Sequence, residues 1–426
     1  MTTAESFLQN HKLLASSLSI QNIVDDFLSE MDKGLQSSEG SLRMIPTYIE
    51  ADNEFITGVP VIAIDAGGTN FRTALVQFNE NGKLEISGLK NSRMPGIDGL
   101  VSKSEFFKII AGYLQNDAHK VDRIGFCFSY PTEIYPDKDG RLLHFSKEVQ
   151  APEVVGQLIG KNLLNTLGTP EKQVVLLNDT VATLLAGKSN AFGKTYDSFI
   201  GYILGTGTNT CYIEKNKNIT KTPNLDLSRN QIINIESGNF NKTPRTDIDL
   251  ALDNSTGSPG AYTFEKMISG GYFGALCLTA FKFAANENVF SEEAKQKILI
   301  LKDLNTETVN KFRHGNDPSN ALLSVFSDVN DFNSANKIID AIIERAAKLV
   351  AANIAAVILK CGKGQTKEKP VLITVEGTTF YKLYTFRTKF EQFLSDFLSG
   401  DKKRYYEFTE VEQSSLVGAA LSALIN

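Results

Sequence analysis

Two glycine-rich turns have the composition of anion-binding sites. The segment IDAGGTNFRTALVQF, residues 64–78, joins two apolar strands through a Gly-Gly-Thr-Asn turn. ILGTGTNTCYI, residues 203–213, repeats the arrangement. Glycine has no Cβ to block approach, so the backbone N–H groups of such a turn can converge on a phosphate, and threonine and asparagine add further donors. A tight β-hairpin with nothing bound is the commoner explanation of one such turn, but two matching turns favour a phosphate site.

Asp65 leads directly into the first turn. Its carboxylate would repel a phosphate unless a cation lay between them, and Mg²⁺ suits that arrangement. We therefore expect Asp65 to hold Mg²⁺ through water. The second turn, GTGTNT, is not the dinucleotide fingerprint, because it lacks the third glycine of GxGxxG and a strand follows it in place of a helix. The chain also lacks a GxxxxGK(S/T) loop.

The elements that must position these turns alternate between strands and helices. The strands are predicted at 61–65, 71–78, 83–89, 123–131, 173–179, 198–209 (with the glycine-rich turn at its end), 210–215, 231–237 and 371–377, and the helices at 19–35, 106–114, 180–188, 264–284, 335–360 and 414–425. This order predicts an α/β fold with mixed or parallel sheets covered by helices. The two similar hairpins predict two halves of similar fold that face each other.

The composition is that of an ordinary globular protein, with 426 residues, 42% of them hydrophobic, and a formal net charge of −5. This balance gives no indication of a nucleic-acid or membrane-surface partner. The longest apolar run, LVAANIAAVILK, is too short to span a membrane, and the first residues do not have the pattern of a signal peptide. The four cysteines form no CxxC pair, so we expect reduced thiols in a cytoplasmic protein and no built-in zinc site.

The ordered motifs of the chain resemble those of the hexokinases, in the actin-like sugar kinase superfamily. The matching segments are LRMIPTYIE, DAGGTNFR, FCFSYP, HFSKE, LLNDTVATLL, GTGTNTCYIE, INIES, SPGAYTFEKMISGGYFG, EGTTFYK and SSLVGAAL. Each segment alone is a weak signal, but the ordered set is specific and covers nearly the whole chain. The resemblance implies ATP-dependent phosphorylation of the 6-hydroxyl of a hexose, with glucose as the first candidate and Mg²⁺ as the accompanying ion.

Asp179 is the candidate general base of that reaction. It lies between the apolar strand VVLL and a helix start, where capping the helix is the commoner role of an aspartate. The match of NDTVATLL to the family implies contact with the sugar 6-hydroxyl instead. A helix N-terminus is expected to keep the carboxylate ionised, as a base must be. The resemblance also implies that Lys147, in HFSKE, is a catalytic cation near the transferring phosphoryl group.

A sugar ring carries many hydroxyls, so its site needs side chains that donate and accept hydrogen bonds. The family match implies that the sugar is bound by Ser129, Ser146, Lys147, Asn178, Asp179, Asn209, Glu236 and Glu265. It implies that ATP is bound by Asp65, Gly67, Gly68, Thr69, Asn70, Arg72, Gly205, Thr206, Gly207, Gly377, Thr378 and Ser415. Residues 376–382, which include Gly377 and Thr378, match the family's adenosine-side segment only if this chain has one extra residue in the turn.

The chain departs from the family pattern at three places. The family's EWGAFG is ESGNF here, and the chain has no tryptophan. Tyr262 stands where the family has a glutamine in NPGQQ, and Phe145 stands where it has a tryptophan. Since the proposed base, lysine and acids are retained, these changes bear on sugar specificity and affinity more than on the reaction.

The resemblance implies a two-lobed, actin-like ATPase fold in which each lobe is a mixed sheet flanked by helices and the active site lies in the cleft. We expect a small lobe of residues 62–178 plus 412–426 and a large lobe of residues 1–61 plus 179–411. The expected partners are a hexose and Mg-ATP, and the oligomeric state is left open. Two alternatives are a catalytically weak sugar-sensing paralogue and an ATPase of the same fold without a sugar substrate.

Overall fold

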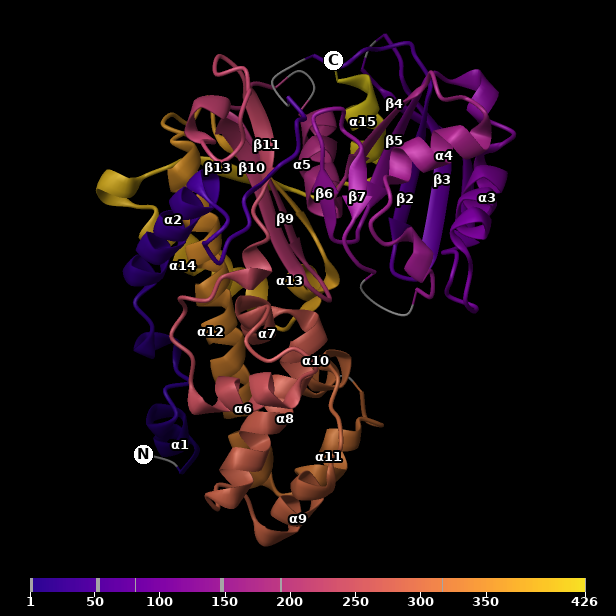
Figure 1. The fold of residues 1–426 in the computed structure, drawn as a ribbon. Helices are drawn as coiled ribbons and strands as arrows, with labels where there is room; N and C mark the ends of the chain where they lie inside the picture. The colour runs from indigo at the N-terminus through magenta and orange to yellow at the C-terminus, as the bar shows by residue number, and fades with distance from the viewer. Residues whose placement is uncertain are drawn as a thin grey trace.

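The computed structural model describes residues 3–50, 54–80, 82–145, 149–191, 194–315 and 317–425. Two β-sheets lie side by side, with helices between and around them (Figure 1). The first has the order β4-β3-β2-β5-β8, from Leu84–Arg93, Asn70–Phe78, Val61–Gly67, Arg123–Phe128 and Gln173–Leu177. The second has the order β1-β11-β10-β9-β12-β13, from Ile45–Pro46, Asn230–Asn234, Thr208–Lys215, Ser198–Leu204, Val371–Glu376 and Tyr406–Thr409.

Both glycine-rich turns join antiparallel neighbours, one in each sheet. β2 pairs antiparallel with β3, and β9 pairs antiparallel with β10. The first strand of each hairpin also pairs in parallel with a further strand, β2 with β5 and β9 with β12. Both sheets are therefore mixed, as predicted for a two-lobed α/β fold. A separate two-stranded ribbon, β6 (Thr132–Ile134) with β7 (Gly140–Leu142), lies beside the first sheet.

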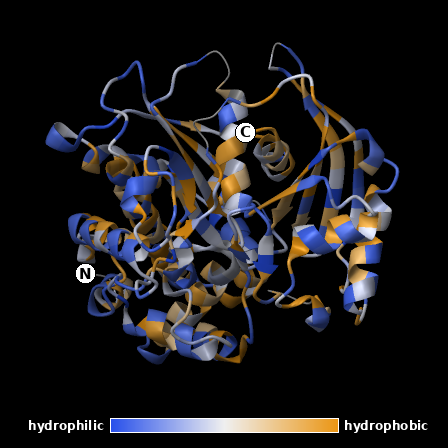
Figure 2. Ribbon diagram, turned by 45° about the horizontal axis from the view of Figure 1, so that its top comes forward, coloured by the Kyte–Doolittle hydropathy of each residue, from blue (hydrophilic) through white to orange (hydrophobic). Residues whose placement is uncertain are grey.

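The first sheet is covered on both faces, which explains why β2 reads as a continuous apolar run. Ile62 and Ile64 belong to a core cluster with α3 (Lys103–Leu114) and α4 (Ile159–Leu167). Val61 and Ala63 point to the other face, into a cluster with α5 (Asp179–Asn190) and α15 (Ser414–Leu424). In Figure 2 the hydrophobic residues lie along the strands and on helix surfaces turned towards them.

The helices α5 and α15 pack between the two sheets. Every residue of α15 is buried. Two close contacts fix its place: a Cβ on Gly125 of β5 would lie 1.7 Å from the Ala419 carbonyl oxygen, and a Cβ on Gly418 would lie 1.9 Å from the Ala182 carbonyl oxygen. Only glycine allows the backbones to approach this closely. The helix α15 thus contacts both the first sheet and α5, the helix whose first residue is the candidate base Asp179.

The 33-residue helix α12 (Val329–Cys361) runs through the core beside the second sheet. The other helices of this half are α1 (Thr3–Asn10), α2 (Ile20–Gln36), α6 (Asp247–Ser255), α7 (Thr263–Ile268), α8 (Gly270–Asn286), α9 (Glu292–Ile300), α10 (Thr306–His314), α11 (Ala321–Val325), α13 (Thr378–Lys382) and α14 (Phe386–Phe397). The described chain contains no helix long and apolar enough to cross a membrane.

One predicted helix was wrong in its extent. The stretch 264–284 is not continuous, because α7 ends at Ile268 and α8 begins at Gly270. The N–H groups of Gly270 and Gly271 donate to the carbonyls of Gly205 and Thr206 at 2.8 and 2.9 Å. The break therefore turns the start of α8 towards the second glycine-rich turn, a contact that helical periodicity does not reveal. The predicted boundaries of the two lobes stay a prediction.

Candidate active site

A cavity of about 990 Å³ opens between the two sheets, at the ends of β5, β8, β10 and β11. Its lining contains most of the residues predicted to bind sugar: Ser129, Asn178, Asp179, Asn209, Glu236 and Glu265. Tyr262 lines it as well. Ser146 and Lys147, the other two predicted sugar residues, lie outside the described residues.

The strand β8 ends at Leu177, and the next two residues deliver the candidate base. Asn178, not Asp179, is the N-cap of α5, since its Oδ1 accepts from the Thr180 N–H at 2.9 Å. Asp179 occupies the first helical position, and its Oδ1 also accepts from the Thr180 N–H, at 2.8 Å. The capping role that local sequence favours for Asp179 is thus taken by its neighbour, which leaves part of the Asp179 carboxylate facing the cavity.

The pKa of Asp179 is raised above its ordinary value. Burial is the largest cause, and the nearby Asp65 carboxylate adds to it, while the Thr180 N–H and the Ser129 hydroxyl lower it. The helix N-terminus does contact the carboxylate, through the Thr180 N–H, but burial raises the pKa more than this contact lowers it. The prediction that the helix end keeps Asp179 ionised therefore took account of only one of the two effects. A carboxylate of raised pKa is a stronger proton acceptor, which suits a general base.

Glu236 is held by a network of amides. Its Oε1 accepts from Asn234 Nδ2 at 2.8 Å and from Asn209 Nδ2 at 3.2 Å. Asn209 also donates to Asn234 Oδ1 at 2.7 Å. Glu236 has φ of 60°, a left-handed conformation that is uncommon for a residue other than glycine and that turns the chain after β11. Burial, the largest cause, raises the Glu236 pKa.

Glu265 lies against the second glycine-rich turn. Its Oε2 accepts from the Thr208 N–H at 2.9 Å. A Cβ on Gly207 would lie 2.7 Å from the same oxygen, so this position requires glycine for the carboxylate to fit. Burial raises the pKa of Glu265, and the Glu236 carboxylate adds to the rise. The carboxyl groups of the two glutamates and of Asp179 all line the cavity and offer hydrogen-bond acceptors, which suits a ligand rich in hydroxyl donors.

In the first hairpin, Asp65 and Arg72 contact each other. Arg72 Nε donates to Asp65 Oδ2 at 2.8 Å, and its Nη2 donates to the same oxygen. The sequence assigned both residues to the nucleotide and did not predict this ion pair. The turn is close to the sugar cavity, because Tyr130 OH donates to the Gly68 carbonyl at 2.9 Å and a Cβ on Gly67 would lie 3.1 Å from Ser129 Oγ.

The second turn meets the segment predicted to hold adenosine. A Cβ on Gly205 would lie 3.6 Å from the Gly377 Cα, and Thr379 Oγ1 donates to the Gly205 carbonyl at 2.9 Å. Gly377 has φ of 121°, which favours glycine. Thr206 and Gly207 line the sugar cavity as well, so this turn lies between the two predicted ligands.

The other nucleotide predictions are spread around these turns. Thr69, Asn70 and Thr378 are exposed, and Ser415 is buried in α15. Glu376, which was not predicted, accepts from Ser414 Oγ and from Thr183 Oγ1, and so connects β12 with α15 and α5. No isolated sequence signal marks Glu376, since it reads as the polar end of a buried strand.

Several cavity residues were missed by sequence reasoning. They are Arg43, Thr47, Tyr130, Thr132, His144, Thr180, Thr208, Asn234, Asn239, Ser258 and Tyr272. Asn234 was the easiest of them to infer from the sequence, because it precedes Glu236 by two positions in the predicted strand 231–237, where alternate residues share a face. In the structure β11 ends at Asn234, and the two side chains meet through a hydrogen bond.

Two family models, both described as hexokinase, match the chain over residues 4–189 and 199–425. Hexokinase-9 of Oryza sativa subsp. japonica is 30% identical over 95% of this chain and 86% of the relative. Glucokinase of Aspergillus niger is 27% identical over 95% of this chain and 93% of the relative. The fold is similar to that of a hexokinase from Schistosoma mansoni complexed with glucose, with a TM-score of 0.77, 24% identity, and coverage of 99% of this chain and 98% of that one.

The family models together span almost the full length, and the site between the sheets contains the acids and amides that the motifs predicted. The chain belongs to the hexokinase family and is a sugar-phosphorylating enzyme.

Proposed function

We propose that this enzyme transfers the γ-phosphoryl group of ATP to the 6-hydroxyl of a hexose, with glucose as the preferred substrate. The observation that carries the proposal is the convergence of Asp179 with Asn209, Glu236 and Glu265 on one cavity. The glucokinase relative and the glucose complex of the similar structure support glucose as the first sugar to test.

The site supplies a base and a set of fixed hydrogen-bond partners. Phosphoryl transfer needs positioning and charge stabilisation more than covalent help from the protein. The carboxylates of Glu236 and Glu265 would accept from ring hydroxyls, and the Asn209 amide, which donates to Glu236 and Asn234, would hold the Glu236 carboxylate in place. These contacts would orient the 6-hydroxyl towards Asp179, which takes up its proton as the phosphoryl group arrives.

The nucleotide would lie on the two glycine-rich turns, with Gly67–Asn70 on one side and Gly205–Gly207 on the other. Mg²⁺ fits beside Asp65, because both Arg72 bonds end on Oδ2 and leave Oδ1 for a metal-bound water. Burial raises the Glu376 pKa most, and the carboxylates of Asp179 and Asp65 raise it further. Acidic groups that repel one another in this way favour the binding of a cation near them. The ion would neutralise charge on the phosphates. Lys147 remains the predicted second cation.

A coupled ADP-release assay with glucose, mannose, fructose and N-acetylglucosamine tests the proposal. We expect sugar-dependent ADP release in the presence of Mg²⁺, fastest with glucose by kcat/KM. Asp179→Ala provides the matched control, and its rate should fall by roughly 10²–10⁴-fold. Glucose binding by calorimetry without any sugar-dependent ADP release would instead support the sugar-sensing alternative.

A further inference from the structure

The connection between α6 and α7 carries residues that line the sugar cavity. Ser258 and Tyr262 lie in this loop, residues 256–262, and Glu265 follows on the first turn of α7. Tyr262 has φ of 53°, so the loop enters α7 through a left-handed residue. The loop contains no helix or strand, and its own recorded backbone hydrogen bond runs from the Ala261 N–H to the Ser258 carbonyl at 3.2 Å, so side-chain contacts must fix the rest of its course.

Lys266, the neighbour of Glu265, reaches under this loop from α7. Its side chain is 3% exposed. Its Nζ donates to Asp253 Oδ1 at 2.6 Å, to Thr256 Oγ1 at 2.9 Å and to the Ser258 carbonyl at 2.7 Å. These three acceptors match the three protons of the ammonium group.

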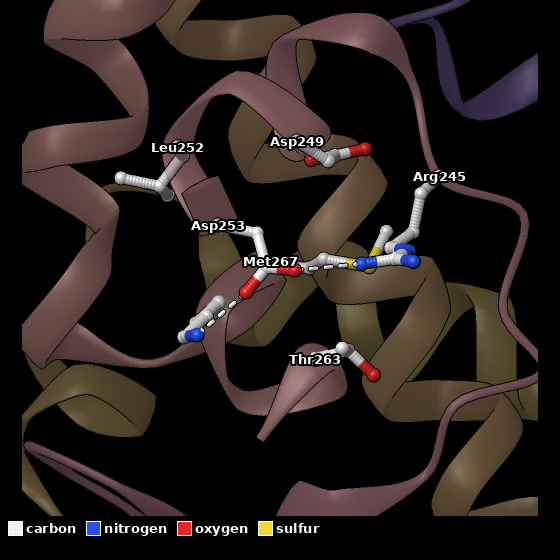
Figure 3. A pocket seen from close by; sticks show the side chains of 7 residues that line it. Arg245, Asp249, Leu252, Asp253, Thr263 and Met267 are labelled. Atoms are coloured by element: carbon white, nitrogen blue, oxygen red, sulfur yellow. Dashed lines mark hydrogen bonds and ion pairs between the residues drawn. The ribbon is translucent and has the colours of Figure 1, made fainter. Parts of the chain in front are cut away.

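Asp253, at the end of α6, joins the lysine to the rest of the loop. The Gly260 N–H donates to both carboxylate oxygens, at 3.1 and 3.0 Å. Arg245 Nη1 donates to Oδ2 at 2.9 Å (Figure 3). The space among these side chains admits no water molecule. One buried carboxylate thus binds the loop directly through Gly260 and indirectly through Lys266.

Stability alone is a weak reason for such a pair. A buried ion pair is often no more stabilising than apolar residues of similar volume, although removing one partner is costly. What the pair does provide is attachment of the loop at three residues, because the ammonium group donates to Thr256 and Ser258 and the carboxylate accepts the Gly260 N–H.

We propose that Asp253 and Lys266 are positioning residues that fix the 256–262 loop, place Tyr262 and Glu265 in the sugar cavity, and so set hexose affinity and the ranking of hexoses. The inference rests on the proposed sugar site. Neither residue touches the cavity, so their effect passes through the loop and through Glu265.

The same helix offers a matched control. Asp249, one turn before Asp253 on α6, forms an ion pair with Arg345 of α12, and the two side chains are 2% and 1% exposed. The hydrogen bonds recorded for this pair in the described chain end on Thr246 and on each other, away from the loop. Like the Asp253–Lys266 pair, it joins a buried aspartate of α6 to a buried basic side chain, but its recorded bonds do not reach residues 256–262.

The experiment compares Asp253→Asn/Lys266→Met with Asp249→Asn/Arg345→Met. Each double change removes both charges of its pair, so neither member is left as an unpaired buried charge. Arg245 also loses the Asp253 carboxylate in the first variant, but its side chain is 31% exposed and stays in contact with solvent. We expect the first variant to raise the glucose KM about tenfold, to keep kcat within about threefold, and to alter the ranking of glucose against mannose and fructose. The control variant should keep the wild-type KM and ranking even where its melting temperature falls.

Thr256→Val is the second variant, because it removes one Lys266 acceptor at a partly exposed position with little change in volume. It should raise the glucose KM about two- to fivefold at unchanged kcat. A wild-type KM and sugar ranking in the folded Asp253→Asn/Lys266→Met variant, or in Thr256→Val if the double variant does not fold, would overturn the inference. An equal rise in KM in the control pair would overturn it too. Absence of hexose turnover in the wild type would instead overturn the proposed function.

Discussion

Asn209 and Asn178 connect the two sheets across the cavity, with Asn209 Nδ2 donating to Asn178 Oδ1 over 3.4 Å. Asn178 follows β8 of the first sheet, and Asn209 lies in β10 of the second. The same Asn209 amide contacts Glu236. A sugar bound here would therefore contact residues from both sheets. Such a ligand favours the conformation in which the two sets of residues can contact it at the same time.

Asn209→Ala should weaken hexose binding more than it slows the chemical step. The change removes the amide that links Asn178, Asn234 and Glu236, and with it the hydrogen bond that Asn234 Oδ1 accepts from Asn209 and one of the two that hold Glu236 Oε1. We expect the glucose KM to rise by about 10- to 100-fold. Steady-state kinetics and calorimetry on the same preparations measure this. A fall in kcat at constant KM would place Asn209 in the phosphoryl-transfer step.

Asp179→Asn should make the ligand-free protein more stable at neutral pH. The folded-state pKa of Asp179 is raised by burial, so the folded protein binds this proton more tightly than the unfolded chain does. The contribution to stability is full below the unfolded pKa of about 3.9 and is lost as pH rises through the folded pKa. An ionised Asp179 therefore costs stability at pH 7.5, and a neutral amide removes that cost.

Thermal melting of the wild type and Asp179→Asn across pH tests this sign. The variant should melt about 2 °C or more above the wild type at pH 7.5, and the difference should shrink towards pH 4. If the variant melted lower at pH 7.5, the carboxylate would be a stabilised anion in the free enzyme.

Tyr262 should adjust sugar affinity through both its side chain and its backbone. It replaces the family's glutamine, lines the cavity, and has φ of 53°. Asparagine tolerates this left-handed conformation better than glutamine does. Tyr262→Asn and Tyr262→Gln should each shift the glucose KM severalfold and change the ranking of hexoses, with the higher melting temperature in Tyr262→Asn. Equal kcat values for all three proteins are expected, and a large loss of kcat at unchanged KM would show that Tyr262 acts on the transition state.

The parts of the fold that depend on local pattern were predictable. The hairpin at 64–78, the strand before Asp179 and the helix after it follow from apolar runs, helical spacing of apolar residues and turn residues. Asp179, Asn209, Glu236 and Glu265 were identified because each belongs to a motif that the family shares. Their common placement in one cavity agrees with that assignment, while their individual roles stay predictions.

The parts that depend on contacts between distant segments were not predictable. Glu376 contacts Ser414 and Thr183 only because β12, α15 and α5 meet between the sheets. The bond from Lys266 to Asp253 depends on rotamers and loop geometry that a residue pattern does not encode. The Arg72–Asp65 pair could have been inferred from the hairpin, because the two residues lie directly opposite each other in the β2–β3 register. The break between α7 and α8 likewise depends on the carbonyls of the second turn.

The position of phosphorylation on the sugar tests the account most directly. After incubation of the enzyme with glucose, ATP and Mg²⁺, phosphorus–proton correlation NMR identifies the carbon that carries the phosphoryl group. The account predicts coupling to the protons on carbon 6, no phosphorylated product from 6-deoxyglucose, and loss of the product signal with Asp179→Asn. A phosphoryl group on another carbon, or an unchanged product yield with Asp179→Asn, would contradict the assignment of Asp179 as the base for the 6-hydroxyl.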